Sequence, residues 1–546
     1  MTSADTVVPA SVVTLLSGPG SKYEAPESIR AFVLYTTQGL LVEASKRYHP
    51  EVQAWLLQLK QGGVQVQPHF VDAARIAQSA AVAAVPSRAE KAGAEDQSSQ
   101  QRAILARIKA AHAADASDIH LVCNNKAGTA TFKYRVDGDL VQPADGAITY
   151  EQGRAFTGAL YNTMCDVAAS FFKPDEPQDA RFAESVLAAS GVYGARVATR
   201  PTDNGFVMVL RILKAADDAL KLDGLGYLDE QIDDLITIMD HSYGLCLFSG
   251  PTGSGKSRTL QVMLSLVAQR TQGREHILTF EQPCEYEIRG ANQTPVDVKV
   301  DAYGKSYPDF AGGIKNAMRL DPDVIMVGEI RDHESAVAAI EAAQTGHMVY
   351  STLHANGAFE IPARLIGEPI AQPRERVLDP TVMKGMVGQR LVQLLCPACS
   401  VPLEEGKDRL KSGVLQRLTR VLSPQALAAV RMRGHDDACP VCKGRGVKKR
   451  QVVAEVVRTN LHLFQVFEKE GHVAARRKWI EENGGISMKM HALLLVALGR
   501  VDPTDAEACV DLLDEEVSSL GITYPPVVAG HSIFKAAAPK AVGSGS

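Results

Sequence analysis

One eight-residue segment constrains the fold of this chain more than any other feature. It reads GPTGSGKS, residues 250–257, with the apolar run LCLFS before it and the helical pattern RTLQVMLSLVAQ after it. This strand, loop and helix context matches a loop that binds nucleoside triphosphates. Glycines let backbone N–H groups face phosphate oxygens, and the helix start adds partial positive charge. A glycine-rich turn without a ligand is the alternative, which the length and context of the motif disfavour.

The residues of this loop have separate expected roles. Lys256 would reach the β and γ phosphates of ATP, and the Ser257 hydroxyl would hold Mg²⁺. Thr252 and Ser254 supply small side chains that a tight turn tolerates. The predicted nucleotide-binding residues are Gly250, Pro251, Thr252, Gly253, Ser254, Gly255, Lys256, Ser257 and Arg258.

Acidic side chains follow two further apolar runs. Glu329 comes directly after DVIMVG, so it would lie at the carboxyl end of a buried strand, where it can hold Mg²⁺ or orient water. The run HILTF is followed by EQPCEYE, which contains Glu281, Glu285 and Glu287. An exposed loop acid is the alternative for each of these three.

Two histidines flank the apolar run MVYST. His347 precedes it and His354 follows it, so on an extended strand they lie at opposite ends, which argues against a shared metal. His354, at the carboxyl end, is better placed for the γ phosphate. A structural hydrogen-bonding role is the alternative for His347.

Charge and hydropathy narrow the class of protein. The formal charge is −5, from 58 Lys and Arg against 63 Asp and Glu, so nucleic-acid binding is not expected as the main function. No uncharged apolar run reaches the length of about 18 residues that crosses a bilayer, and the first residues do not resemble a secretory signal. We therefore expect a cytoplasmic protein, in which disulfide pairing of the nine cysteines cannot be assumed.

Four of the cysteines form two tight pairs. Cys396-Pro-Ala-Cys399 and Cys439-Pro-Val-Cys442 fit a closed tetrahedral Zn²⁺ site, in which each pair supplies two ligands. The intervening loop is longer than in most such sites. Unliganded thiols and a redox function are the alternatives. The expected role of the zinc is structural.

The pattern of apolar runs predicts an α/β fold with about three or four compact units in 546 residues. Residues 224–395 alternate apolar runs with helical stretches, as in a mixed parallel sheet covered by helices. Residues 101–215 combine a helical stripe (Ile104, Leu105, Ile108, Ala111) with strand-like runs and turn signals at Asp137-Gly138 and at Asp203-Asn204-Gly205. The predicted division is an N-terminal docking domain (1–85), a polar linker (86–100), an α+β domain (101–215), a connector (216–223), the phosphate-loop core (224–395), a zinc subdomain (396–450), a helical part of the core (451–535) and a disordered tail (536–546).

Four motifs occur in one order: GPTGSGKS, TFEQPCEYE, DPDVIMVGEIRD and TGHMVYSTLHAN. Together with ASDIH, YRVDG, PQDAR and RVATRPT, they resemble the secretion ATPase superfamily. This superfamily comprises the hexameric motors of type II secretion, of type IV pilus assembly and retraction, and of type IV secretion. The resemblance covers roughly residues 100–510 and implies a PAS-like α+β domain before the core.

The resemblance also implies roles for individual residues. It makes Glu285 the general base, Glu329 the Walker B glutamate, His347 and His354 the histidine box, and Arg196 and Arg211 the arginines that contact nucleotide phosphates. An unpaired surface arginine is the alternative for each of the last two. Two positions depart from the family pattern: Gln282 replaces an aspartate, and Lys315 stands where arginine is frequent, with Arg319 nearby.

As a member of this superfamily, the chain is expected to form a homohexameric ring peripheral to the inner face of the inner membrane. There it would drive an integral membrane platform protein with Mg·ATP. The four cysteines favour pilus assembly or type II-like secretion over retraction. The basic run 443–450 could meet acidic lipids or a partner, although a solvated loop is the alternative. A retraction motor, a conjugative DNA-translocating ATPase and a non-enzymatic ATP-binding scaffold remain as alternative functions.

Overall fold

The computed structural model describes residues 16–17, 23, 25–36, 39–61, 67–72, 75–76, 88–166, 171–182, 192–214, 221–282, 284–296, 298–300 and 306–535. The chain divides into two compact units, Met1–Ile104 and Leu105–Ser546. The predicted tail, 536–546, and residues 216–220 of the predicted connector lie outside the described residues. No helix within the described ranges combines the length and the apolar character that crossing a membrane requires.

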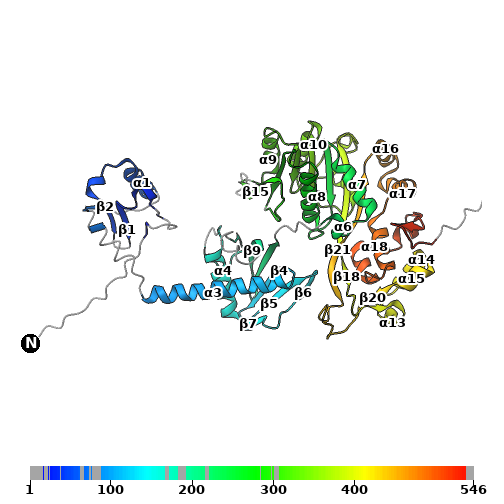
Figure 1. Cartoon of the computed structure of the whole chain (residues 1–546), viewed down its shortest axis with the longest axis horizontal. Helices are drawn as coiled ribbons and strands as arrows, with labels where there is room; N and C mark the ends of the chain where they lie inside the picture. Colours follow the sequence, from blue (N-terminus) through cyan, green and yellow to red (C-terminus); the bar gives the residue numbers. More distant parts are fainter. Residues whose placement is uncertain are drawn as a thin grey trace, which may run out of the picture. The chain divides into compact units, whose positions relative to one another are not determined.

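The first unit contains a small sheet beside one helix (Figure 1). Its elements are η1 (Glu27–Ile29), β1 (Val33–Thr36), β2 (Gly39–Glu43), η2 (Ala44–Lys46), α1 (Pro50–Gln61) and β3 (Pro68–Val71). The sheet order is β1-β2-β3, with β1 and β2 antiparallel and β2 and β3 parallel. Trp55 from α1 packs with Val33 and Leu40 in the core of this unit.

Helix α3 (Arg88–Ala113) includes most of the stretch that the sequence predicts as a linker. Residues 88–100 are therefore helical, because their Ala, Glu, Lys and Gln residues have high helix propensity even without an apolar stripe. Further along α3, Ile104, Ile108 and Ala111 are buried, as the predicted stripe requires.

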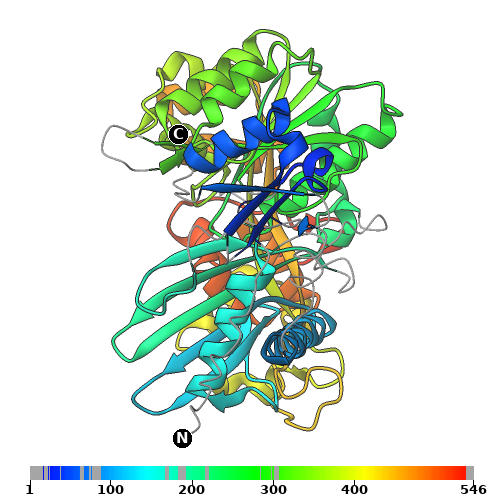
Figure 2. The ribbon, with the colours of Figure 1, turned by 90° about the vertical axis from the view of Figure 1, so that its left-hand side faces the viewer.

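The α+β region follows as an antiparallel sheet, whose long strands are the cyan arrows in Figure 2. Its elements are β4 (Ala116–Asn124), β5 (Thr129–Val136), β6 (Asp139–Val141), β7 (Ala147–Thr149), α4 (Tyr150–Met164), β8 (Gln178–Arg181), β9 (Val192–Thr202) and β10 (Gly205–Lys214). The strand order is β6-β5-β4-β10-β9-β8, with β7 paired to β5. Both predicted turns are confirmed, since Asp137 and Gly138 link β5 to β6, and 203–204 link β9 to β10.

A seven-stranded mixed sheet forms the core of the phosphate-loop region. The strands and helices of this region are α6 (Leu222–Leu225), α7 (Asp229–Met239), β11 (Gly244–Ser249), α8 (Lys256–Arg270), β12 (Ile277–Glu281), β13 (Ala291–Pro295), β14 (Val298–Val300), β15 (Ser306–Pro308), α9 (Phe310–Ala317), β16 (Val324–Val327), α10 (His333–Gln344), β17 (Met348–Leu353), η4 (Ala358–Glu360), α11 (Ile361–Ile366), α12 (Arg374–Val377), β18 (Met383–Leu395) and β21 (Val447–Arg458). The order in the seven-stranded sheet is β13-β12-β16-β17-β11-β18-β21, parallel except for the pair β18 and β21. Strands β14 and β15 form a separate two-stranded sheet.

The sheet is covered on both faces, as the continuous apolar runs predict. Along β11, Leu245 and Leu247 join one buried cluster, whereas Cys246 and Phe248 join another. Alternate residues of a strand point to opposite faces, so each cluster lies on its own side of the sheet. Helix α10 contributes to the first cluster and helix α8 to the second.

The remaining elements lie between and after the two cysteine pairs. They are β19 (Val401–Pro402), α13 (Leu403–Gly406), η5 (Lys407–Arg409), α14 (Val414–Val421), α15 (Pro424–Ala429), β20 (Arg431–Met432), α16 (Leu461–Glu470), α17 (His472–Asn483), α18 (Met488–Ala497), α19 (Pro503–Val510), α20 (Glu515–Ser518), β22 (Val527–Val528) and β23 (His531–Ser532). The predicted boundary at residue 450 falls inside β21, which belongs to the core sheet. The zinc subdomain is therefore an insertion between two paired strands, because Leu395 of β18 lies opposite Val447 of β21.

Candidate functional site

Three parts of the predicted site lie at one edge of the core sheet. Ser249, the last residue of β11, lies opposite Leu353, the last residue of β17. Val327, the last residue of β16, pairs with Ser351 of the same strand β17. The phosphate loop therefore follows the carboxyl end of β11, Glu329 follows that of β16, and His354 follows that of β17. Open α/β sheets bind ligands at the carboxyl ends of their strands.

The phosphate loop depends on glycine at three positions. The φ angles of Gly250, Gly253 and Gly255 are 146°, 79° and 89°. Residues that carry a Cβ atom rarely adopt such positive values. A Cβ atom on Gly250 would also lie 2.3 Å from the carbonyl oxygen of Gln389 in β18. The loop is thus bent tightly against the adjacent strand.

Two polar residues that sequence reasoning missed support this loop. Gln389, which is fully buried, donates through Nε2 to the Ser254 carbonyl oxygen at 2.9 Å. Its Oε1 accepts a hydrogen bond from the Tyr227 hydroxyl at 2.7 Å. Neither residue belongs to a motif, and only the pairing of β11 with β18 brings Gln389 to the loop.

Lys256 and Ser254 provide polar groups inside the loop. Lys256 Nζ donates to the carbonyl oxygens of Gly250 at 2.7 Å and Pro251 at 3.1 Å. Burial lowers the pKa of Lys256, against the charges of Glu329 and Glu285, which raise it. The buried Ser254 hydroxyl has no hydrogen-bond partner among the described residues. Glycine turns, a buried lysine and this hydroxyl fit the triphosphate of ATP.

Glu329 and His354 are in direct contact. Nε2 of His354 lies 3.2 Å from Oε1 of Glu329, and Nε of Arg331 lies 2.6 Å from Oε2 of the same carboxylate. The Glu329 side chain is only 17% exposed. The two residues predicted from separate motifs thus form one polar group, which can bind a hydrated Mg²⁺ or a phosphate oxygen.

The three glutamates after β12 separate into different environments. Glu281 is buried and accepts hydrogen bonds from Thr279 Oγ1 at 2.7 Å and Gln293 Nε2 at 2.9 Å, while burial raises its pKa. Glu287 is exposed, and Glu285 is half-buried. The charge of Glu285 acts on Lys256, as expected of a carboxylate close to the phosphate loop.

Helix α8 holds the segment that carries Glu285. The Arg258 guanidinium lies over the ring of Tyr286, 5.1 Å from its centroid. Gln261, one turn further along α8, donates through Nε2 to the Glu287 carbonyl oxygen at 2.6 Å. The segment directly after Glu285 is therefore attached to the helix that follows the phosphate loop.

His347 does not join this site within the chain. It precedes β17, at the end of the strand opposite to His354, and its Nδ1 lies 3.0 Å from the Ala342 carbonyl oxygen. Within the chain, six strand residues separate His347 from the edge that carries Glu329, and its catalytic role stays a prediction. Its structural alternative agrees with this hydrogen bond.

The two predicted arginines are neighbours in the antiparallel sheet. Arg196 of β9 pairs with Arg211 of β10, and both side chains are about half exposed. Arg211 Nε lies 3.1 Å from Asp118 Oδ1. Burial lowers the pKa of Arg211, but the charges of Asp118 and Glu285 outweigh this and raise it. Arg211 is therefore within electrostatic range of the Glu285 segment.

The two departures from the family pattern lie on the protein surface. Gln282 is exposed, and Lys315 is exposed in the last turn of α9.

The four paired cysteines converge, as predicted from their spacing. Their Sγ atoms lie within 4.8 Å of one another, with Cys396 and Cys439 at 3.8 Å and Cys399 and Cys442 at 3.5 Å. Tetrahedral zinc with Zn–S bonds of about 2.3 Å places its sulfurs about 3.8 Å apart. The Gly446 N–H donates to Cys442 Sγ at 3.2 Å, and backbone hydrogen bonds from Cys442 and Val441 help to lower the pKa of Cys439 to about 7. The donor set therefore fits structural zinc.

The zinc subdomain also contacts the α+β region. Arg445, three residues after Cys442, forms an ion pair with Asp137 at 2.8 Å, and both side chains are largely buried. Gln393 of β18 donates to the Asp137 carbonyl oxygen at 2.7 Å. The turn predicted at Asp137-Gly138 therefore serves as a contact point as well as a hairpin.

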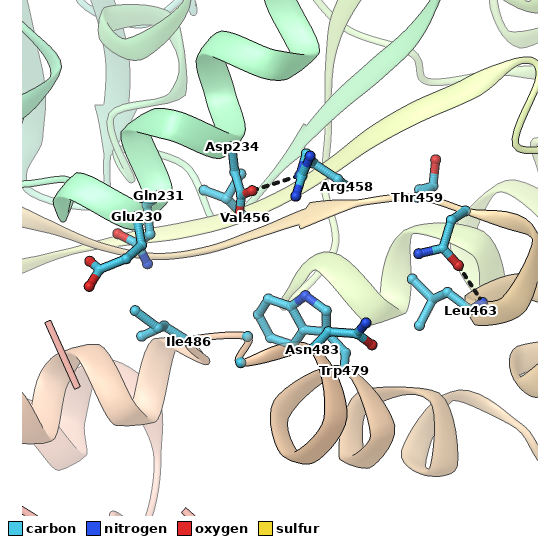
Figure 3. A pocket seen from close by; sticks show the side chains of 13 residues that line it. Glu230, Gln231, Asp234, Val456, Arg458, Thr459, Leu463, Trp479, Asn483 and Ile486 are labelled. Atoms are coloured by element: carbon cyan, nitrogen blue, oxygen red, sulfur yellow. Dashed lines mark hydrogen bonds and ion pairs between the residues drawn. The ribbon is translucent and has the colours of Figure 1, made fainter. Parts of the chain in front are cut away.

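A further pocket of about 290 Å³ lies between α7, the end of β21 and helix α17 (Figure 3). An ion pair between Asp234 and Arg458, 2.7 Å long, crosses one wall, and the indole of Trp479 lies opposite. None of the predicted nucleotide or metal residues lines this pocket.

Comparison with known proteins agrees with the sequence motifs. The family model described as "Type II/IV secretion system protein" matches residues 93–508. Type II secretion system protein E of Pseudomonas aeruginosa is 34% identical over 388 residues, covering 71% of this chain and 70% of that protein. Type II secretion system ATPase E of Vibrio cholerae is 32% identical over 397 residues, covering 72% of each. Among solved structures, the Legionella pneumophila ATPase DotB is 21% identical, covers 73% of this chain and 92% of its own, and has a TM-score of 0.49. The chain belongs to the type II/IV secretion system protein family, whose E proteins are ATP-hydrolysing motor enzymes.

Proposed function

We propose that this chain hydrolyses Mg·ATP as a homohexamer and powers pilus assembly or type II-like secretion through an inner-membrane platform protein. The observation that carries the proposal is the contact between Glu329 and His354 at the edge where the phosphate loop begins. Family membership supports a secretion role, and the tetracysteine site supports assembly rather than retraction. In this proposal the ring works at the cytoplasmic face of the membrane as a peripheral protein.

Each group at the edge has a defined task in this proposal. Lys256 and the loop amides would hold the triphosphate, while Ser257 and Glu329 would hold Mg²⁺, which neutralises phosphate charge. Glu285 would accept a proton from the attacking water. His354 would orient the Glu329 carboxylate, from which its Nε2 lies 3.2 Å away. Arg196 and Arg211 would stabilise phosphate charge as the α+β region moves against the core.

Replacement of Lys256 tests the site. K256A should lower ATP turnover by about 100-fold or more, because removing one charged donor from a phosphate site has an effect of that order. Phosphate release by the purified full-length protein is the measurement. K407A is the matched control, since Lys407 pairs with Glu404 on the exposed surface of the insertion. Turnover retained in K256A would overturn the site assignment.

The platform and assembly parts of the proposal need a separate test. Deletion of the gene should abolish surface pili or secretion, and the wild-type gene but not K256A should restore them. Surface pili that persist in the deletion strain would favour a retraction motor. Hydrolysis stimulated by DNA would favour a conjugative translocating ATPase instead.

A further inference from the structure

A buried charged cluster lies behind the segment that follows His354. It consists of Glu360, Glu455, Arg476 and Glu516, which come from η4, β21, α17 and α20. Arg476 approaches Glu455 at 3.2 Å, Glu516 at 3.4 Å and Glu360 at 3.6 Å. The side chains of Glu455 and Glu516 are each 1% exposed. Two buried carboxylates and the half-buried Glu360 thus surround a single guanidinium.

This cluster is not explained by stability alone. Burying charges costs several kcal/mol per ion, and apolar residues of similar volume are often as stabilising as a buried ion pair. Here one oxygen of Glu455 and one of Glu360 have no hydrogen-bond partner among the described residues. Burial accordingly raises the pKa of Glu455. A specific contact made by one of these carboxylates would explain why the charges are buried.

Glu455 makes such a contact with the segment that carries His354. Its Oε1 accepts a hydrogen bond from the Ala358 N–H at 2.6 Å, four residues after His354. The approach is close, because a Cβ on Gly357 would lie 2.7 Å from this oxygen and 3.3 Å from Arg476 NH2. At the other end of the segment, Leu353 is fixed in β17. His354 therefore lies on a short segment tethered at both ends.

Arg476 links this tether to the C-terminal helices. It extends from α17, stacks over the ring of Phe359 at 5.2 Å, and contacts Glu516 of α20. Glu516 also accepts hydrogen bonds from Ser487 at 2.6 Å and Tyr524 at 2.7 Å. A displacement of α17 would consequently reach the Ala358 hydrogen bond through the contact between Arg476 and Glu455. A displacement of α20 would act through the contact between Glu516 and Arg476 as well.

We propose that Glu455 and Arg476 are positioning residues for His354, through which the C-terminal helices control the contact between His354 and Glu329. This inference rests on the proposed function, because its readout is ATP hydrolysis. Glu455 touches neither the phosphate loop nor the Glu329 carboxylate in the structure; it acts through the backbone of the segment 355–358.

Substitutions at Glu455 test the proposal. E455A removes the acceptor for Ala358 and should lower kcat by about 100-fold, a loss that a misplacement of about 1 Å can cause, with KM for ATP within about twofold. E455Q keeps one carbonyl oxygen as an acceptor for Ala358, so its kcat should be about tenfold higher than that of E455A. If E455A does not fold, E455Q alone should still show a loss of about tenfold. E507Q is the matched control, since Glu507 forms a largely buried pair with Arg417 of α14 instead of with Arg476.

A double-mutant cycle separates positioning from general damage. If Glu455 acts through His354, adding E455Q to H354A should change the residual single-turnover rate by less than about twofold. An equal loss in the wild-type and H354A backgrounds would overturn the proposal, as would an equal loss in E507Q. Wild-type protein without ATP turnover would instead refute the proposed function itself.

Discussion

His354 Nε2 lies 3.2 Å from Glu329 Oε1, although 24 residues and a helix separate the two in sequence. The contact exists because β16 and β17 are parallel neighbours whose carboxyl ends meet. Arg331 forms an ion pair with the other carboxylate oxygen of Glu329, so each oxygen of this carboxylate has its own partner. A carboxylate held in this way keeps its orientation without help from solvent.

E329Q should abolish hydrolysis while preserving nucleotide binding. The amide keeps the shape of the side chain but loses the charge that pairs with His354 and Arg331, whereas Lys256 and the loop remain intact. Turnover should fall by about 100-fold or more, and the affinity for a fluorescent ATP analogue should change by less than about threefold. E334Q, at an exposed position of α10, should have neither effect. Near-normal turnover in E329Q would contradict the Mg²⁺ role of Glu329.

The purified protein should contain about one zinc per chain, held by the four paired cysteines. C442S or a strong chelator should remove the metal and unfold the insertion, because structural zinc contributes on the order of 10 kcal/mol. Elemental analysis gives the zinc content, and protease sensitivity of residues 396–446 reports the unfolding. C509S should retain the metal, since Cys509 is solitary. Wild-type protein that lacks zinc and has a stable insertion would contradict the prediction.

Breaking the ion pair between Arg445 and Asp137 should destabilise the protein. Either R445A or D137A leaves a largely buried charge without its partner, which costs about 3 kcal/mol. The free energy of unfolding of the double variant should fall by much less than the sum of the two single-variant losses, because no unpaired charge remains buried. Denaturant midpoints give these free energies. E404A, which breaks an exposed pair, should change stability by less than about 0.5 kcal/mol. Additive losses at Arg445 and Asp137 would show that the pair is not coupled.

The protein should lose stability as the pH falls below about 6.5, in part because of His491. Burial lowers the pKa of His491 to about 4, and its Nδ1 accepts a hydrogen bond from the Ala454 N–H at 3.2 Å. The unfolded chain therefore binds a proton at a pH where the folded chain does not. His491 therefore contributes up to about 3 kcal/mol to the free energy of unfolding. This contribution is fully present above about pH 6.5 and is lost as the pH falls toward 4.

H491N isolates this effect, because asparagine supplies an acceptor for Ala454 but does not titrate. Its denaturant midpoint should fall less than that of the wild type between pH 7 and pH 5. The exposed histidine His462 provides the control variant H462N, which should follow the wild type. Parallel pH profiles for H491N and the wild type would exclude His491 as the cause.

Much of the fold and site could be predicted from local pattern. The phosphate loop, Glu329 and His354 each follow an apolar run that becomes a buried parallel strand, and the ends of such strands meet at one edge. The turn at Asp137-Gly138 could also be predicted, because few residue pairs suit a tight hairpin. The polar stretch predicted as a linker is helical from residue 88, and the sequence did not reveal this because helix propensity without an apolar stripe leaves no periodic signal.

The sequence by itself determined the phosphate loop, the two cysteine pairs and the order of strands and helices, because each loop, pair or element depends on residues that are close together in the chain. Tertiary structure decided the rest. It placed His347 away from the edge, brought Gln389 and Tyr227 to the phosphate loop, and assembled Glu455, Arg476 and Glu516 behind His354. Those contacts depend on which strands become neighbours and which helices pack behind them. Strand pairing joins residues more than a hundred positions apart, and no local spacing records it.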